Sequence, residues 1–216
     1  MIKSTSGERQ IPVERENGER CHRRVSRQFF DLPTLELARA LLGKLVVREI
    51  DGQSLSGRIV ETEAYLGRKD PASHAFRGVT RRNSTMFGPP GYAYVYFVYG
   101  NHYCLNVVSG PDGTGEAVLV RALQPISGIE QMKRNRRQES ETNLANGPGK
   151  LCQALSIDTR MNGTSFESDM LYLAEGNNSS KTIARSTRVG ISKGKEKLWR
   201  FYLKDNPFVS NYRETR

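Results

Sequence analysis

The sequence predicts an α+β fold: a single domain with a curved, largely antiparallel β-sheet, surrounding helices and a protruding β-hairpin. Several apolar, β-branched segments follow one another, and short turns such as Asp51-Gly52 and Gly100-Asn101 separate them. Turns of this kind join antiparallel strands. Short helical patterns flank these segments. A chain of 216 residues is long enough to bury one core of this type.

The first part of the chain supports this architecture element by element. Residues 1–26 are polar, charged and aperiodic, which predicts a disordered basic tail ahead of a folded domain at 27–216. A helical pattern follows, with Asp31 as its candidate cap and Gly43 as its stop. Strands are then predicted at 45–50 and at 57–66.

The remaining elements follow a long irregular stretch at 67–91. A loop of this length in a compact domain is usually either functional or disordered. After it, a β-hairpin is predicted around the Gly100-Asn101 turn. The elements predicted downstream of residue 91 are strands at 92–98, 103–108 and 117–123, a basic helix at 128–137 and a short helix around 151–155.

The strand at 57–66 is the most informative segment. Side chains alternate across a strand, so Ile59, Glu61, Glu63 and Tyr65 are expected on one face. Two carboxylates beside an aromatic ring suit a site that stacks a flat molecule and activates a water. The alternative is an amphipathic edge strand whose charges lie in water.

Polar and aromatic residues on the next strands extend this candidate site. By parity Tyr94 and Tyr96 share a face with Tyr92, which is also the usual arrangement of aromatic side chains that pack across a sheet. Tyr99, next to the hairpin turn, is a candidate wedge between nucleic-acid bases. Asn106 and Arg121 lie within apolar strands and therefore need polar partners. A structural hydrogen bond would satisfy Asn106, and an ion pair with Glu61 or Glu63 would satisfy Arg121.

Composition limits the class of protein. Thirty-three Lys and Arg against 23 Asp and Glu give a formal charge of +10, which attracts polyanions such as nucleic acid or an anionic membrane surface. No apolar run reaches membrane-spanning length, and no signal-peptide pattern is present. Three widely spaced cysteines indicate a reducing, intracellular setting: the cytoplasm and nucleoid of a bacterium, or the nucleus of a eukaryote. We expect no metal and no cofactor.

Much of the positive charge is concentrated near the end of the chain. Residues 181–204 contain eight Lys or Arg and one acidic residue, Glu196. This concentration favours a surface that faces phosphates, although a solubilising surface is the alternative.

Several motifs, taken together and in order, resemble the single-domain alkyladenine (3-methyladenine) DNA glycosylases of the mammalian type. The resemblance covers roughly residues 28–210. The matching segments are Arg58-Ile59-Val60-Glu61-Thr62-Glu63-Ala64-Tyr65-Leu66-Gly67, Tyr94-Val95-Tyr96-Phe97-Val98-Tyr99-Gly100, Cys104-Leu105-Asn106, Leu119-Val120-Arg121-Ala122, Gly147-Pro148-Gly149-Lys150-Leu151-Cys152-Gln153-Ala154-Leu155, Arg188-Val189-Gly190 and Arg200-Phe201-Tyr202.

The resemblance implies a role for each site residue. Glu63 resembles the general base, and Arg121 and the backbone carbonyl of Val189 resemble the groups that hold the attacking water. Glu61 is interpreted as a supporting group, mainly because of the family pattern. The remaining implied roles are Tyr65, His74 and Tyr96 as walls of the base pocket, Leu119 as its floor, Asn106 as the gate against normal guanine and Tyr99 as the side chain that intercalates into DNA.

The function implied is a monofunctional DNA glycosylase that flips alkylated or deaminated purines out of the duplex and hydrolyses the N-glycosidic bond, initiating base excision repair. Its partner would be double-stranded DNA containing damaged purines, bound by a monomer, with no membrane partner. Two alternatives stay open: a damage-binding protein without catalysis, and an RNA-binding or tRNA-modifying domain built on a similar sheet.

Overall fold

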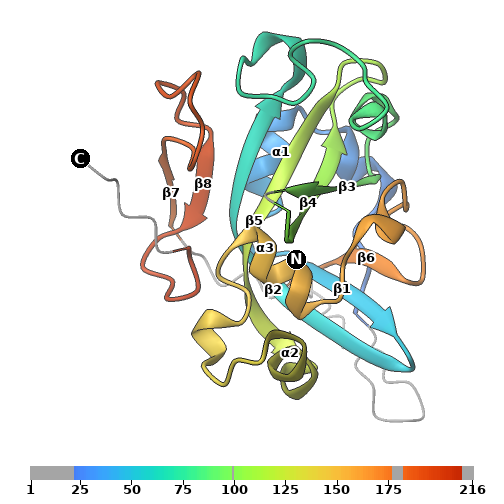
Figure 1. Cartoon of the computed structure of the whole chain (residues 1–216), viewed down its shortest axis with the longest axis vertical. Helices are drawn as coiled ribbons and strands as arrows, with labels where there is room; N and C mark the ends of the chain where they lie inside the picture. Colours follow the sequence, from blue (N-terminus) through green and yellow to red (C-terminus); the bar gives the residue numbers. More distant parts are fainter. Residues whose placement is uncertain (1–21, 99, 177–181, 211–216) are drawn as a thin grey trace, which may run out of the picture.

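The fold is organised around β2, the longest strand of an antiparallel sheet (Figure 1). The computed structural model describes residues 22–98, 100–176 and 182–210. Within these residues the sheet runs in the order β3-β4-β5-β2-β1-β6. In addition, β8 pairs with β2 on one side and with β7 on the other. The strands are β1 (Leu45–Ile50), β2 (Gln53–Leu66), β3 (Ala93–Val98), β4 (His102–Ser109), β5 (Glu116–Ser127), β6 (Leu171–Ala174), β7 (Ile183–Ser186) and β8 (Arg200–Leu203). The predicted α+β class and antiparallel sheet are confirmed.

Three short α-helices pack around the described part of the sheet: α1 (Thr34–Ala40), α2 (Ile129–Arg136) and α3 (Pro148–Ala154). The first differs from the prediction, because Asp31 ends a 3₁₀ helix at Arg27–Asp31 and does not cap an α-helix. Pro33 explains the break. The residue before a proline is restricted to extended backbone, and Leu32 has φ −62° and ψ 143°. The α-helix therefore begins only after Pro33.

Two successive irregularities interrupt the pairing of β2 with β5. Ile59 pairs with Leu123 and Glu61 with Ala122, so Val60 is an extra residue on β2; one step later, Arg121 is an extra residue on β5. Bulges of this kind re-aim side chains and are frequent beside active sites. Ile59 and Val60 both lie in the apolar core. Both are fully buried, and the face on which Ile59 lies relative to Glu61 stays a prediction.

The sheet has one apolar face and one polar, aromatic face. Val95, Leu105, Val107 and Val120 belong to the main core together with residues of α1. Thr62 shares that side, since its hydroxyl donates to the carbonyl of Ala38 at 2.8 Å. The residues of β3, β4 and β5 that line the cavity on the second face are Tyr94, Tyr96, Val98, His102, Cys104, Asn106, Leu119 and Arg121. The loop at 67–91 and the segment at 187–199 contribute to this second face, where the candidate site lies.

The predicted tail at residues 1–26 lies mostly outside the described residues. Its last residues pair with β6: Val25 donates its N–H to the carbonyl of Leu173 at 3.1 Å and is 7% exposed. Tyr99 is not described, so the protruding hairpin stays a prediction, although β3 and β4 pair up to Val98 and His102. No helix within the described ranges is long and apolar enough to cross a membrane.

Candidate active site

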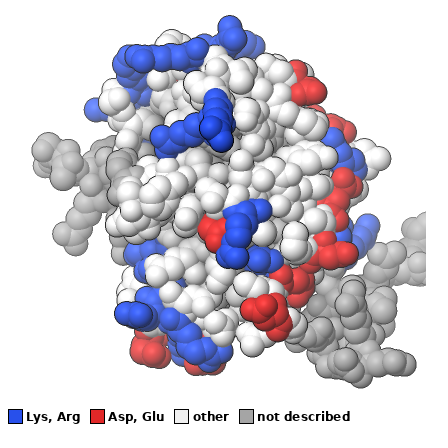
Figure 2. All heavy atoms as spheres, turned by 45° about the vertical axis from the view of Figure 1, so that its right-hand side comes forward, with Lys and Arg blue, Asp and Glu red and all other residues white. Residues whose placement is uncertain are grey.

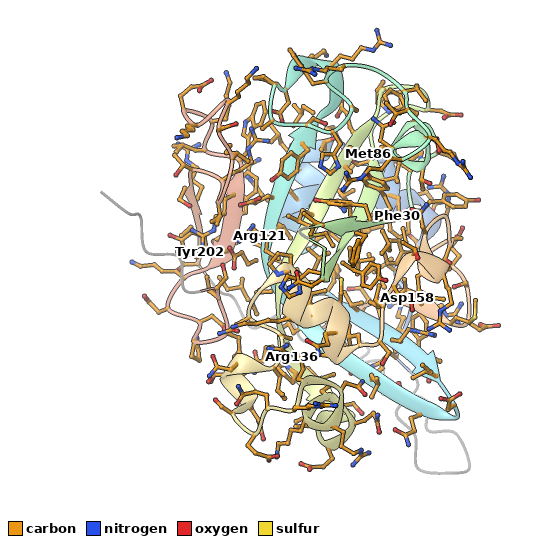
Figure 3. All side chains as sticks on the ribbon, viewed as in Figure 1. Phe30, Met86, Arg121, Arg136, Asp158 and Tyr202 are labelled. Carbon is orange, nitrogen blue, oxygen red and sulfur yellow. The ribbon has the colours of Figure 1, made fainter. Side chains whose placement is uncertain are left out.

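A cavity of about 680 Å³ opens on the polar face of the sheet. This volume lies within the range of about 300–1,000 Å³ that is typical of small-molecule sites. Met86, Arg121 and Arg136 all contribute to its lining and mark its extent along the molecule (Figure 3). Most of the site residues predicted from sequence also line it: Tyr65, His74, Tyr96, Asn106, Leu119, Arg121 and Val189.

Glu63 lies directly behind this cavity and is itself fully buried. Its Oε1 accepts the backbone N–H of Val189 at 2.7 Å, and its Oε2 accepts the hydroxyl of Tyr65 at 2.8 Å. A terminal nitrogen of Arg121 lies 3.4 Å from Oε1. All three contacting residues line the cavity, so Glu63 lies next to it. Val189 thus meets Glu63 through its N–H, and the predicted role of its carbonyl stays a prediction.

Glu61 is also fully buried but is enclosed by donors. Its Oε1 accepts hydrogen bonds from the Nε atoms of Arg121 at 2.9 Å and Arg200 at 2.6 Å. Ser210 donates its backbone N–H at 2.8 Å and its hydroxyl at 2.9 Å. Burial opposes ionisation, yet the charges of Arg121 and Arg200 and these hydrogen bonds lower the pKa of Glu61. The predicted ion pair between Arg121 and the strand carboxylates is confirmed.

Burial and neighbouring charge fix the ionisation of the other groups around the carboxylates. Burial and the charge of Glu63 raise the pKa of Tyr65 well above its ordinary value, so the phenol stays a proton donor. Burial lowers the pKa of Arg121, but the charges of Glu63 and Glu61 raise it by more, so the pKa of Arg121 is raised overall. Burial raises the pKa of Cys104 on the cavity wall. Its thiol is therefore a poor nucleophile at neutral pH.

Three aromatic rings, those of His74, Tyr94 and Tyr96, lie together in the cavity wall. The ring centroids of His74 and Tyr96 are 4.5 Å apart, and those of Tyr94 and Tyr96 are 5.1 Å apart. The Nδ1 atom of His74 lies 3.1 Å from the hydroxyl of Tyr94. Desolvation of the imidazole and the charge of Arg82 lower the pKa of His74, which favours a neutral imidazole at pH 7. Burial raises the pKa of Tyr94 to about 12, so its hydroxyl stays protonated.

Asn106 and Leu119 meet across paired strands in the cavity wall. The amide nitrogen of Asn106 donates to the carbonyl of Tyr94 at 3.0 Å, which is the structural hydrogen bond that its place in an apolar strand predicted. This bond holds the side-chain amide against the wall of the cavity. Leu119, 4% exposed, supplies apolar surface beside it.

The basic segment at 181–204 divides into two groups. Arg188 and Arg200 are buried in ion pairs with Asp70 and Glu61, and they are therefore unavailable to phosphate. The cations exposed to solvent are Arg185, Lys193, Lys195, Lys197 and Lys204. Lys181 lies outside the described residues.

A second basic surface lies on the loop between β2 and β3. Lys and Arg also gather at the upper end of the face in Figure 2, the end where this loop lies in Figure 1. The exposed basic residues of this loop are Arg68, Lys69, Arg77, Arg81 and Arg82.

Sequence reasoning missed three parts of the site. Arg200 and Ser210 complete the shell around Glu61, and Asp70 pairs with Arg188. Arg188 and Arg200 lie in motifs that resemble the family, whereas Asp70 lies in an irregular loop where no local pattern marks it. Among the described residues, no cluster of three or more His, Cys, Asp or Glu side chains could hold a metal ion.

The chain is similar to known proteins over most of its length. The model of the family described as Methylpurine-DNA glycosylase matches residues 28–207. A protein of Prosthecochloris aestuarii is 52% identical over 189 residues, covering 87% of this chain and 91% of its own. One of Carboxydothermus hydrogenoformans is 50% identical over 188 residues, covering 86% and 98%. A third, of Desulfitobacterium hafniense, is 46% identical over 200 residues, covering 87% and 98%. Each is named "Putative 3-methyladenine DNA glycosylase".

Proposed function

The chain belongs to the methylpurine-DNA glycosylase family, and on that premise we propose that Glu63 is the general base with which it hydrolyses the N-glycosidic bond of damaged purines. It is a DNA glycosylase that acts on alkylated purines in base excision repair. The observation that carries the proposal is the contrast between the two carboxylates. Glu61 is enclosed by arginines and Ser210, whereas Glu63 lies behind the cavity with Tyr65, Val189 and Arg121 around it.

The reaction needs one base and one water. Glu63 accepts a proton from the water as its oxygen attacks C1′ of the flipped nucleotide. The electrons of the N-glycosidic bond leave with the purine, which gives a free base and an abasic sugar. A cationic alkylated purine departs as a neutral molecule and needs no acid. A general base of this kind contributes about 10²–10⁴-fold.

Glu63 has no exposed surface, so the attacking water has to pass the residues around it to reach its carboxylate. The attacking water has to enter between Tyr65, Arg121 and Val189, the residues that separate the carboxylate from the cavity. We assign to Arg121 and to the Val189 carbonyl the task of holding that water. The hydroxyl of Tyr65 has to give up or share Oε2 when the water binds.

The cavity walls suit a flat, electron-poor base. Tyr65 on one side and His74 and Tyr96 on the other offer ring faces between which a purine stacks, while Leu119 supplies an apolar floor. Each ring contributes about 0.5–2 kcal/mol to binding of a cationic base by cation–π attraction. We assign to Asn106, whose side-chain amide is held in the cavity wall by the carbonyl of Tyr94, the exclusion of the 2-amino group of guanine, which would protect normal DNA.

Only the flipped nucleotide of the DNA partner has to enter the cavity. We propose that the protein binds double-stranded DNA containing alkylated or deaminated purines as a monomer, flips the lesion and fills the gap with Tyr99. We assign residues 27–216 to this glycosylase domain. Strand cleavage requires an amine that forms a Schiff base with the sugar. The expectation that no lysine lies in the pocket was wrong, because Lys150 lines the cavity. Its amine donates to the side-chain oxygen of Asn146 at 2.8 Å, and we propose that it takes no part in the reaction. Borohydride trapping of a covalent protein–DNA adduct would contradict this part.

Release of 3-methyladenine from alkylated DNA tests the role of Glu63. Wild type should release the base, and Glu63→Gln should bind the same DNA but lose about 10²–10⁴-fold in rate. Glu130→Gln, which alters an exposed carboxylate on α2, is the control. Equal rates for wild type and Glu63→Gln would contradict the role. Near-zero release by both, with intact lesion binding, would support a binding protein without catalysis.

A further inference from the structure

A fully buried ion pair lies behind the cavity wall and has no part in the reaction described above. Arg188 and Asp70 both have side chains that are 0% exposed. The guanidinium donates through both terminal nitrogens to the two carboxylate oxygens, with Nη2–Oδ1 at 2.8 Å. The Nη1 atom also donates to the carbonyl of Ala64 at 3.0 Å. A buried pair is costly to desolvate and need not add stability, so its position calls for an explanation.

The arginine of this pair holds two groups that meet Glu63. Its guanidinium lies 4.7 Å from the ring centre of Tyr65 and 5.1 Å from that of Trp199, so it packs against both rings. Tyr65 donates its hydroxyl to Glu63, and Val189, the residue after Arg188, donates its N–H to the same carboxylate. One buried side chain therefore fixes a ring and a backbone amide on opposite oxygens of Glu63.

The aspartate fixes the neighbouring part of the cavity wall. Oδ1 of Asp70 accepts the N–H of Ala72 at 3.1 Å, and Oδ2 accepts the N–H of Leu66 at 3.4 Å. Ala72 and His74 line the cavity, whereas Leu66 ends β2. The pair thus ties together three segments that are far apart in sequence: the end of β2, the start of the loop at 67–91, and the segment that begins at Arg188.

We propose that Asp70 and Arg188 are a positioning pair for the glycosylase reaction, which sets Tyr65, Val189 and the 70–74 loop around Glu63 without touching the substrate. The inference rests on the proposed role of Glu63. Because neither side chain has exposed surface, the pair does not touch DNA, and its loss should slow the chemical step by more than it weakens DNA binding. Displacing a reacting group by about 1 Å can cost about 10²-fold in rate.

The test uses Arg188→Ala with chemical rescue. Single-turnover release of 3-methyladenine at saturating enzyme should fall by about 10- to 100-fold, while the dissociation constant for the lesion duplex changes little. Millimolar guanidinium chloride should restore part of the rate by occupying the space beside Asp70, whereas sodium chloride at the same ionic strength should not. Asp70→Asn, which keeps the shape of the side chain, should lose rate in the same way without rescue by guanidinium.

The control is Lys44→Met, which breaks the Lys44–Glu175 ion pair outside the cavity lining and should leave the rate unchanged. An unchanged release rate in Asp70→Asn or Arg188→Ala would overturn the positioning role, and so would a defect confined to DNA affinity. Glu63→Gln measured beside them separates the two ideas. If Glu63→Gln stays active, the proposed base is wrong; if it is inactive and the pair variants are not, only the positioning role is wrong.

Discussion

Glu61 and Glu63 point the same way from one strand and are equally buried, yet most of their neighbours differ. Glu61 accepts hydrogen bonds from two arginines and from Ser210, which comes from the far end of the described chain. Glu63 shares one of these arginines and otherwise meets a phenol and a backbone amide at the cavity wall. Identical functional groups thus acquire different tasks from their neighbours. The enclosed carboxylate supports the site, and the one behind the cavity is the proposed base.

The largest expected difference between Glu61 and Glu63 is in their contribution to the free energy of unfolding. Glu61→Ala leaves the buried side chains of Arg121 and Arg200 without their shared carboxylate, which should lower the free energy of unfolding by about 3–5 kcal/mol. Glu63→Ala should cost less, because Arg121 keeps its pairing with Glu61. Urea unfolding of both variants measures the difference. Equal losses would mean that the two carboxylates are structurally equivalent.

The second test shortens each carboxylate by one methylene. Glu63→Asp withdraws the base from the cavity wall and should slow single-turnover base release by about 10²-fold. In Glu61→Asp the arginines and Ser210 can follow the shorter side chain, so release should fall by less than about tenfold. The comparison fails if Glu61→Asp is the slower enzyme while both proteins are folded.

The third test uses pH. The native pKa of Glu61 is lowered below its ordinary value of 4.5, so its ionised form contributes stability that is complete above pH 4.5 and is lost as the pH falls toward the lowered pKa. Wild type should therefore lose more stability than Glu61→Gln between pH 5 and pH 3, as measured by urea unfolding at each pH. Parallel curves for the two proteins would contradict the arginine-stabilised carboxylate.

A smaller effect is expected at Tyr65, whose ring and hydroxyl can be separated. Tyr65→Phe keeps the stacking face and frees one oxygen of Glu63, so release should change by less than about tenfold, the scale of one hydrogen bond. Tyr65→Ala removes the ring and should lose more, and the loss should be larger for cationic 3-methyladenine than for neutral hypoxanthine. Release assays on both lesions decide this; an equal loss for the two would argue against cation–π recognition.

The smallest effect concerns the basic segment that also supplies Arg200 to Glu61. Replacing the exposed Lys193, Lys195 and Lys197 by Gln should reduce the salt dependence of DNA binding by about 0.9 in log–log slope for each phosphate that these lysines neutralise in the wild type. The control is Arg27→Gln with Arg160→Gln, two arginines in surface ion pairs. Fluorescence anisotropy across a salt series measures the slopes. An unchanged slope would leave these lysines as a solubilising surface.

Local patterns predicted much of the fold because they depend on neighbouring residues. The strand at Leu45–Ile50 has the predicted limits, and β3, β4 and β5 lie within a few residues of theirs. Short elements were missed: β6, β7 and β8 have four residues each, too few for a clear alternation. The bulge at Val60 and Arg121 was also unpredictable, because it depends on the pairing of two strands that are far apart in sequence.

The sequence by itself determined the α+β class, the family resemblance and the residues that meet at the cavity. It left Glu61 and Glu63 on one face with no physical difference between them; only the family pattern assigned their roles. The tertiary structure separated them by bringing Arg200 and Ser210 to one and Val189 to the other. It also joined Asp70 to Arg188. The two partners in each of these contacts are far apart in the sequence. Local patterns cannot pair them, because only the folding of the whole sheet brings them together.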